Sequence, residues 1–184
     1  METKRLWLRA ARASDLNEFL AIRNSEFVLK YNAMKPLTHE EAAAQIASDA
    51  ASGDVFYLEA KEGGALIGAI YLEQDSLRYG VRALGTSYYL GERYAGQGYM
   101  TEALCEVMRY VFEERNADVL SARVFRGNEA STRLLMHLGF VNEGCLRRCV
   151  MGYGGVIYDD LVFSVLKEDA AVYAVRFRAA QTLC

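Results

Sequence analysis

A short glycine-rich stretch between a strand-like run and an amphipathic helix constrains this chain more than any other feature. Residues 93–98 read Arg-Tyr-Ala-Gly-Gln-Gly, after an apolar run at 84–90 and before a helical pattern that begins at Tyr99. Two glycines allow a tight turn and let a ligand approach the backbone closely. The amide N–H groups that open a helix lack intrahelical partners and lie at the positive end of its dipole. This order of elements therefore predicts an anion site suited to a pyrophosphate.

The spacing of the glycines excludes two common phosphate loops. No stretch reads GxxxxGK followed by Ser or Thr, and the loop lies in mid-chain, away from the first strand that carries the GxGxxG of a dinucleotide-binding fold. The remaining pattern, Arg-x-x-Gly-x-Gly, is by itself compatible with an ordinary turn before a helix. A second pattern favours a ligand loop, because Asn-Glu-Ala-Ser at 128–131 opens a short helix that ends in Leu-Gly-Phe at 138–140.

Together these two patterns resemble the signatures of the GNAT acetyltransferases. That family has a pyrophosphate loop of the form Gln/Arg-x-x-Gly-x-Gly/Ala, followed one helix and one strand later by an Asn, a short helix and a Gly-Phe that enters a strand. Further segments resemble the ribosomal-protein N-terminal alanine acetyltransferase branch, and the resemblance spans residues 3–168. These segments are 3–9, 22–24, 36–38, 98–104 and 158–160.

The periodicity of the chain predicts an α/β fold with the element order βααβββαβαββ. Thr38 and Glu41 form a candidate capping box, and apolar residues recur at helical spacing from Met100 to Phe112. The expected strands are 5–10, 55–60, 65–73, 84–90, 119–125, 140–151 and 156–166, and the expected helices begin at Ser14, Thr38, Tyr99 and Asn128. The resemblance implies one GNAT domain at 3–168 with a mixed, splayed central sheet flanked by helices. The tail, 169–184, is expected to form a helix, to fray or to pack on a partner.

The resemblance implies acetyl-CoA as co-substrate, with no metal ion. In the family the sheet splays beside the fourth strand and the pantetheine arm enters there, so the backbone of Tyr89 and Leu90 is expected to pair with the arm. A backbone N–H near Leu90 is expected to stabilise the tetrahedral oxyanion. The expected cofactor-binding residues are Tyr89, Leu90, Arg93, Ala95, Gly96, Gln97, Gly98, Tyr99, Met100, Asn128 and Ser131.

Two residues are candidates for the catalytic roles that acetyl transfer requires. Many family members have a Tyr seven residues after the helix-opening Asn, but Leu135 stands there, so Ser131 is the expected hydrogen-bond donor to the CoA thiolate. The alternative for Ser131 is a serine that only satisfies backbone N–H groups. The branch often has a Glu five residues before the last Leu of the fourth strand, and Gly85 stands there. Glu73 is the candidate base across the sheet; a solvated surface residue, with a water relay as base, is the alternative.

The resemblance also implies an amine acceptor that attacks the thioester directly in a ternary complex. The N-terminal α-amine of a protein or peptide is the expected class, and Tyr158 is the candidate acceptor-binding residue, with an aromatic core position as its alternative. The segment 28–37 is expected to border the acceptor cleft. A small-molecule amine (polyamine, amino sugar or amino-acid analogue) stays open. So does an acetyl-CoA-binding regulatory module without turnover, because Gly85 and Leu135 replace acid–base groups of the family.

Composition restricts the other classes of partner. The net charge of −3 gives no reason to expect a nucleic-acid partner, and 52% hydrophobic residues supply a sizeable core. The chain lacks an 18-residue apolar segment and the apolar run of a signal peptide, so a cytoplasmic protein away from the membrane is expected. Homodimers are common in the branch, and the tail is a candidate interface. No CxxC pair occurs, so the cysteines at 105, 145, 149 and 184 are expected to be buried free thiols.

Overall fold

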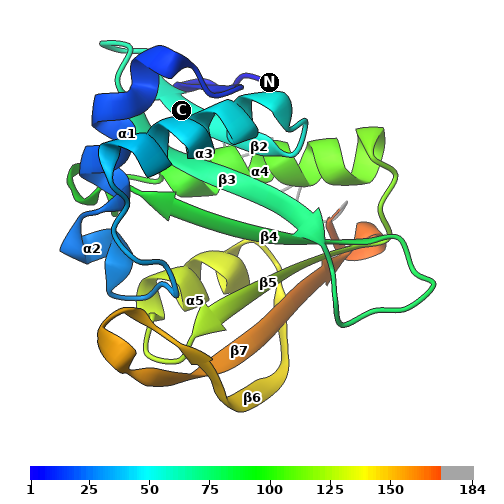
Figure 1. The fold of residues 1–184 in the computed structure, drawn as a ribbon. Helices are drawn as coiled ribbons and strands as arrows, with labels where there is room; N and C mark the ends of the chain where they lie inside the picture. The colour runs from blue at the N-terminus through cyan, green and yellow to red at the C-terminus, as the bar shows by residue number, and fades with distance from the viewer. Residues whose placement is uncertain (171–184) are drawn as a thin grey trace.

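The order and pairing of the strands follow the sequence pattern. The structure, a computed structural model, describes residues 1–170. Its strands form one sheet in the order β1-β2-β3-β4-β5-β7-β6 (Figure 1). They are β1 (Leu6–Arg9), β2 (Val55–Ala60), β3 (Leu66–Gln74), β4 (Ala83–Leu90), β5 (Val119–Phe125), β6 (Val141–Met151) and β7 (Ile157–Leu166). Neighbouring strands are antiparallel except β4 and β5, which are parallel. The predicted mixed sheet is therefore confirmed.

Helices cover both faces of this sheet. The helices α1, α2 and α3 lie on one face, and α4 and α5 pack on the other (Figure 1). They are α1 (Leu16–Arg23), α2 (Glu26–Leu29), α3 (His39–Ala51), α4 (Tyr99–Arg109), which continues as a π-helical turn (Tyr110–Glu114), and α5 (Glu129–His137). The predicted order lacks α2, a single turn capped by the Ser25 side chain. Four residues are too few to produce a periodic signal in the sequence.

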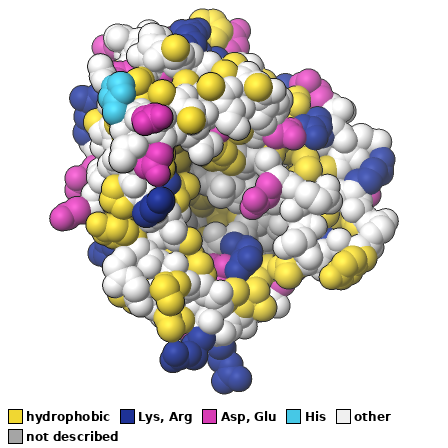
Figure 2. Space-filling view, in the orientation of Figure 1, with side chains coloured by type: hydrophobic (Ala, Val, Ile, Leu, Met, Phe, Trp, Pro, Cys, Tyr) yellow, Lys and Arg dark blue, Asp and Glu magenta, His cyan; other side chains and the backbone are white. Residues whose placement is uncertain are grey.

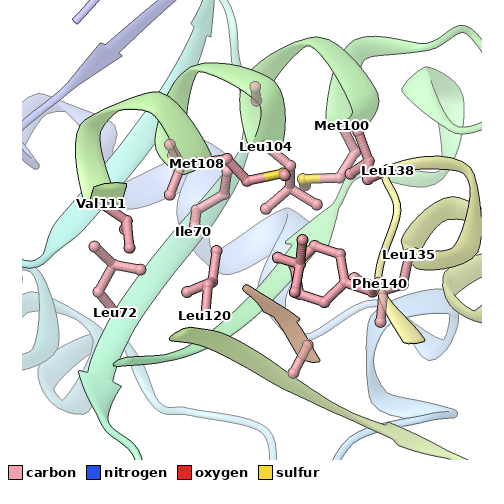
Figure 3. Close-up of a cluster of buried hydrophobic side chains, with 14 of the residues drawn as sticks. Ile70, Leu72, Met100, Leu104, Met108, Val111, Leu120, Leu135, Leu138 and Phe140 are labelled. Carbon is pink, nitrogen blue, oxygen red and sulfur yellow. The ribbon is translucent and has the colours of Figure 1, made fainter. Parts of the chain in front are cut away.

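The larger apolar core lies between α4 and the sheet. Figure 3 shows the α4 side chains pointing at those of β3 and β5, while Leu135, Leu138 and Phe140 close the end of the cluster near α5. The predicted stripe on α4 is buried throughout: Met100, Ala103, Leu104, Val107, Met108, Val111 and Phe112. A fully buried Leu or Met contributes about 1.5–3 kcal/mol. This core therefore fixes α4, and the loop before it, against the sheet.

A smaller core on the other face is organised around a buried carboxylate. Asp49 of α3 accepts hydrogen bonds from the hydroxyls of Tyr57 at 3.0 Å and Tyr71 at 3.1 Å. A buried charge is tolerated only when it is hydrogen-bonded, so these bonds hold α3 on β2 and β3. The helix begins at the predicted capping box, in which Thr38 and Glu41 each accept a hydrogen bond from the other's backbone N–H.

The cysteines differ from the prediction in their exposure. Among the described residues, Cys105, Cys145 and Cys149 are free thiols, but only Cys105 is partly buried. Cys145 and Cys149 lie on the edge strand β6, which is exposed along nearly its whole length. Cys184 and most of the predicted tail lie outside the described residues; residues 167–170 are helical.

Candidate active site

The parallel strands β4 and β5 separate toward their carboxyl ends (Figure 1). Their last paired residues are Thr86 and Ala122, although β4 continues to Leu90. The Gly91 N–H donates to the Ile67 carbonyl of β3 at 2.8 Å. Successive residues of a strand direct their amides to opposite edges, so the Leu90 N–H faces the gap beside β5. This edge of β4 is where an extended ligand can pair with the backbone.

The gap between residues 87–90 of β4 and 123–125 of β5 is called the opening here. Beside it, β3 approaches β4 so closely that only glycine fits. Gly68 pairs with Leu90, and a Cβ on Gly68 would overlap the Tyr89 carbonyl oxygen and lie 3.1 Å from the Leu90 Cα. The missing side chain therefore sets the position of β4 at the opening.

The predicted phosphate loop joins β4 to α4. Gly96 and Gly98 have left-handed φ angles of 73° and 78°, and Gly98 is the N-cap of α4. No side chain of the described residues caps this helix. The Gln97 side chain donates to the Arg93 carbonyl at 2.7 Å, which ties the turn together. The first-turn amides of α4 are thus left for a ligand, and their partial positive charge favours an anion.

Arg5, which the sequence analysis did not single out, lies against this loop. Its Nη1 donates to the Gln97 carbonyl at 3.0 Å, and its guanidinium lies 4.3 Å from the centre of the Tyr99 ring. Glu102 of α4 accepts from the Arg5 Nε at 2.6 Å. Burial would raise the pKa of Glu102, but hydrogen bonds from Thr3 and Arg5 outweigh burial and hold that pKa below its usual value. A fixed cation therefore lies beside the helix N-terminus.

The remaining residues predicted to bind the cofactor lie along the same segment. Arg93 and Ala95 are exposed in the loop, whereas the Met100 side chain is buried in the larger core. The Tyr89 side chain points to the opposite face, where its hydroxyl lies 3.4 Å from that of Tyr71. The side chains of Met100 and Tyr89 are both buried, so only their backbone groups are candidates for contact with a cofactor.

The helix α5 follows β5 and so lies on the other side of the opening from β4. The Asn128 side chain accepts the Ser131 N–H at 3.3 Å, so Asn128 caps the helix. Ser131 is half-buried, and its hydroxyl is not the capping group. Leu135 is fully buried in the larger core. The hydroxyl of Tyr88, a second residue that the sequence analysis missed, is buried close to Ser131.

On the opposite face of the sheet, Glu73 lies beside Gly85. The two residues pair across β3 and β4. A Cβ on Gly85 would lie 3.2 Å from the Glu73 Cγ and 3.7 Å from the Ser121 Oγ. The Glu73 side chain therefore lies over the space that the glycine leaves, beside the position at which the resemblance predicts a carboxylate.

A second carboxylate on this face, Asp160 of β7, is only 3% exposed. Its Oδ2 accepts from the Arg123 Nε at 2.6 Å, whereas its Oδ1 has no hydrogen-bond partner within residues 1–170. Burial raises the pKa of Asp160, although the Arg123 charge acts in the other direction. Alternate residues of a strand share a face, so Arg123 lies on the same face as Ser121 and Glu73.

Aromatic side chains border the same face. Tyr158 stacks on Phe125 at 4.8 Å between ring centres and meets Tyr31 edge-on at 6.4 Å. The Tyr158 hydroxyl donates to the Lys30 carbonyl at 3.3 Å, which joins the loop after α2 to β7. Figure 2 shows that this face is hollowed near its middle, with acidic and basic side chains around the hollow.

Within residues 1–170, no group of three or more His, Cys, Asp or Glu side chains is placed to hold a metal ion. Over the same range, no helix has the length and hydropathy required to cross a membrane.

Comparison with known proteins assigns the chain to a family. Residues 5–141 match the acetyltransferase (GNAT) domain. The chain is 30% identical over 173 residues to the uncharacterized N-acetyltransferase YoaA of Bacillus subtilis, and the match covers 91% of this chain and 96% of that protein. Its fold matches the ribosomal-protein-S5-alanine acetyltransferase from Vibrio fischeri (TM-score 0.76, 22% identity, 92% of this chain and 97% of that chain). It also matches the spermidine N-acetyltransferase from Vibrio cholerae, solved with CoA and spermine (TM-score 0.77, 20% identity, 91% and 98%). With the domain matched over most of its length, the chain belongs to the GNAT family of N-acetyltransferases.

Proposed function

We propose that the chain transfers the acetyl group of acetyl-CoA to a primary amine, and that the acceptor is the N-terminal α-amine of a protein or peptide. The observation that carries the proposal is the continuity between the free edge of β4 and the uncapped N-terminus of α4 after Gly98. A pyrophosphate held at that N-terminus would lie beside Arg5, and the attached arm would run along residues 87–90. The thioester would then lie in the opening.

Acetyl transfer in such a complex breaks one bond and forms another. The amine nitrogen attacks the thioester carbonyl carbon, the C–S bond breaks with its electron pair on sulfur, and the amine loses a proton to a base. The Leu90 N–H stabilises the oxyanion, and a donor of this kind is worth about 3–4 kcal/mol. The Asn128 side chain caps the helix, so the Ser131 hydroxyl is not needed for capping. In this proposal it donates a hydrogen bond to the departing thiolate.

Glu73 is the base in this proposal. Replacing it as Glu73→Gln should lower kcat/KM for the amine about 100-fold at pH 7, since positioned general bases contribute about 10²–10⁴-fold. The loss should shrink at high pH, where the amine is already neutral. Glu62→Gln in the exposed turn before β3 is the matched control. An unchanged kcat/KM in Glu73→Gln at pH 7 would assign proton removal to a water relay.

The choice of acceptor rests on the acidity of amines and on the fold. An α-amine has a pKa of about 8 and a lysine side chain a pKa of about 10.4, so at pH 7.5 about a quarter of the first is neutral against about a thousandth of the second. A single exposed carboxylate at residue 73 is a modest base and favours the more acidic amine. The fold shared with the ribosomal-protein-S5-alanine acetyltransferase supports the same choice.

A small polyamine is the second candidate acceptor. The observation in its favour is the pair of carboxylates, Glu73 and Asp160, on the face of the sheet that Tyr158 borders; one Asp160 oxygen has no hydrogen-bond partner within residues 1–170. Such groups attract a cationic amine. The shared fold of the spermidine N-acetyltransferase solved with spermine is compatible with this choice. A module that binds acetyl-CoA without turnover is the remaining alternative.

An amine panel tests these proposals. Purified protein is incubated with acetyl-CoA and separately with peptide N-termini, lysine side chains, polyamines, amino sugars and amino-acid analogues, and acetylated products are identified by mass. Preferred acetylation of peptide N-termini is the expected result. Preference for polyamines would select the second candidate. Tight binding of acetyl-CoA with no product from any amine would overturn catalysis and leave a regulatory module.

A further inference from the structure

On the side of the opening where the phosphate loop and α4 lie, here called the cofactor side, a buried hydroxyl lacks a well-formed hydrogen bond to any of the described residues. Tyr88 lies in β4, beyond the last residue that pairs with β5. Its ring packs against the larger core that also contains residues of α4 and α5. Its hydroxyl has no hydrogen-bond partner of good geometry within residues 1–170. A buried hydroxyl without a partner is costly, so its position requires an explanation.

A polar side chain close to the Tyr88 hydroxyl belongs to the other side of the opening. Ser131 lies in the first turn of α5, close to Tyr88. Burial raises the pKa of Tyr88, and the nearby Ser131 side chain lowers it by a smaller amount. The Ser131 N–H is taken up by Asn128, which leaves the serine hydroxyl free of the capping role. The Tyr88 hydroxyl on β4 and the Ser131 side chain on α5 therefore lie close together, near the end of β4 that leads into the phosphate loop.

We propose that the Tyr88 hydroxyl is a second catalytic donor, which together with Ser131 hydrogen-bonds the coenzyme A sulfur as it leaves. The inference rests on the proposed acetyl transfer. It also accounts for Leu135, because the family's donor at that position is replaced here by a phenol that reaches the opening from β4. When the C–S bond breaks, the electron pair stays on sulfur and both hydroxyls donate to it. The amine proton goes to Glu73, and solvent later protonates the thiolate.

The acidity of Tyr88 decides whether its hydroxyl transfers a proton to the sulfur or only donates a hydrogen bond to it. Burial raises the pKa of Tyr88 to about 12, against a smaller opposite effect of Ser131. A thiol has a pKa of about 8.5, so transfer of the phenolic proton to a thiolate is unfavourable by more than about three pKa units. Tyr88 therefore keeps its proton and acts as a hydrogen-bond donor. Its contribution should not change with pH between about 6 and 9.

The variant Tyr88→Phe keeps the ring and removes only the hydroxyl. Hydrogen bonds to charged groups are worth about 1.5–3 kcal/mol, so kcat should fall about 10- to 100-fold while the KM for acetyl-CoA changes less than about threefold. Removing an unpaired buried hydroxyl should leave the protein at least as resistant to denaturant as wild type. Tyr110→Phe, which also packs on the larger core but at the other end of α4, is the matched control and should keep full activity.

Binding of the product separates this inference from the proposed function. Wild type should bind CoA more tightly than desulfo-CoA, which lacks the thiol, and the preference should grow as the pH rises toward 9. Tyr88→Phe and Ser131→Ala should each weaken that preference. An active wild type with an unchanged kcat and an unchanged CoA preference in Tyr88→Phe would overturn the role of Tyr88 alone. Failure of wild type to bind either compound would overturn both proposals.

Discussion

The two sides of the opening are built in different ways. The cofactor side consists of the end of β4, the loop 93–98 and the first turn of α4, which are consecutive in the chain. The acceptor side consists of side chains from several strands: Glu73, Ser121, Arg123, Tyr158 and Asp160. The first presents backbone amides, and the second presents carboxylates, a guanidinium and aromatic rings. A backbone site depends on local conformation, whereas a side-chain site depends on strand register and on which residues the sheet brings together.

One carboxylate on each side illustrates the difference. Glu102 accepts hydrogen bonds from Thr3 and Arg5 and has a lowered pKa. Asp160 has one oxygen without a partner in the described chain and a raised pKa. On the cofactor side, the Glu102 carboxylate is thus fully hydrogen-bonded before any ligand arrives. The acceptor side retains an uncompensated acceptor, as expected where a cationic substrate must be exchanged.

The largest expected effect comes from Gly68, which pairs with Leu90 beside the opening. In Gly68→Ala the new Cβ would overlap the Tyr89 carbonyl and must displace β4. Overpacking against backbone should lower the free energy of unfolding by about 3 kcal/mol and reduce both acetyl-CoA binding and turnover. Gly53→Ala, where nothing lies within 4 Å of the new Cβ, should change stability by less than about 0.5 kcal/mol. Urea denaturation measures both, and equal stability of the two variants would contradict the close approach.

A smaller effect should come from the phosphate loop on the cofactor side. Gly98→Ala places a Cβ in a left-handed residue with φ of 78°, which costs about 1–2 kcal/mol without a backbone clash. Gly80→Ala imposes similar strain at φ of 70° in the loop between β3 and β4, in open space. Both variants should lose a similar amount of stability. Only Gly98→Ala should also lower the affinity for acetyl-CoA, by about tenfold as measured by calorimetry. Equal affinities would exclude residues 93–98 as the phosphate site.

The elements with local signals were predictable from sequence. The bounds of β5, the first residue of α4 and the Thr38 capping box follow the predictions closely. Each depends on a periodic pattern or on a capping residue within one turn. The anion loop was predictable for the same reason, since two glycines and a helix start are adjacent in the chain. The register Glu73↔Gly85 was also within reach, because one hairpin sets it.

Residues that meet through distant pairing were not predictable. Arg5 and Glu102 are 97 residues apart, and only the packing of the N-terminal segment on α4 joins them. Tyr88 reads as one more aromatic strand residue, because the sequence does not reveal where β4 and β5 separate. Cys145 and Cys149 are exposed on β6, which lies at the edge of the sheet because β7 inserts beside β5. These features follow from the order in which the strands pair in the sheet, which the sequence pattern does not give.

The smallest expected effect concerns Glu102 and Asp160, whose ionisation should change the stability of the fold in opposite directions. A lowered folded pKa means that Glu102 stabilises the fold above its unfolded pKa, near 4.3, and loses that contribution as the pH falls through the folded value. A raised folded pKa means that the fold containing Asp160 loses stability as the pH rises from the unfolded pKa, near 3.9, through the folded value. Glu102→Gln should therefore destabilise by about 1 kcal/mol at pH 7 and by less at pH 3. Asp160→Asn should be neutral or stabilising at pH 7, since the Arg123 left behind is 43% exposed, and this advantage should vanish toward pH 3. Urea denaturation from pH 3 to pH 7 measures how the stability change of each variant depends on pH. If both variants changed stability in the same direction, the electrostatic distinction between the two sides would be wrong.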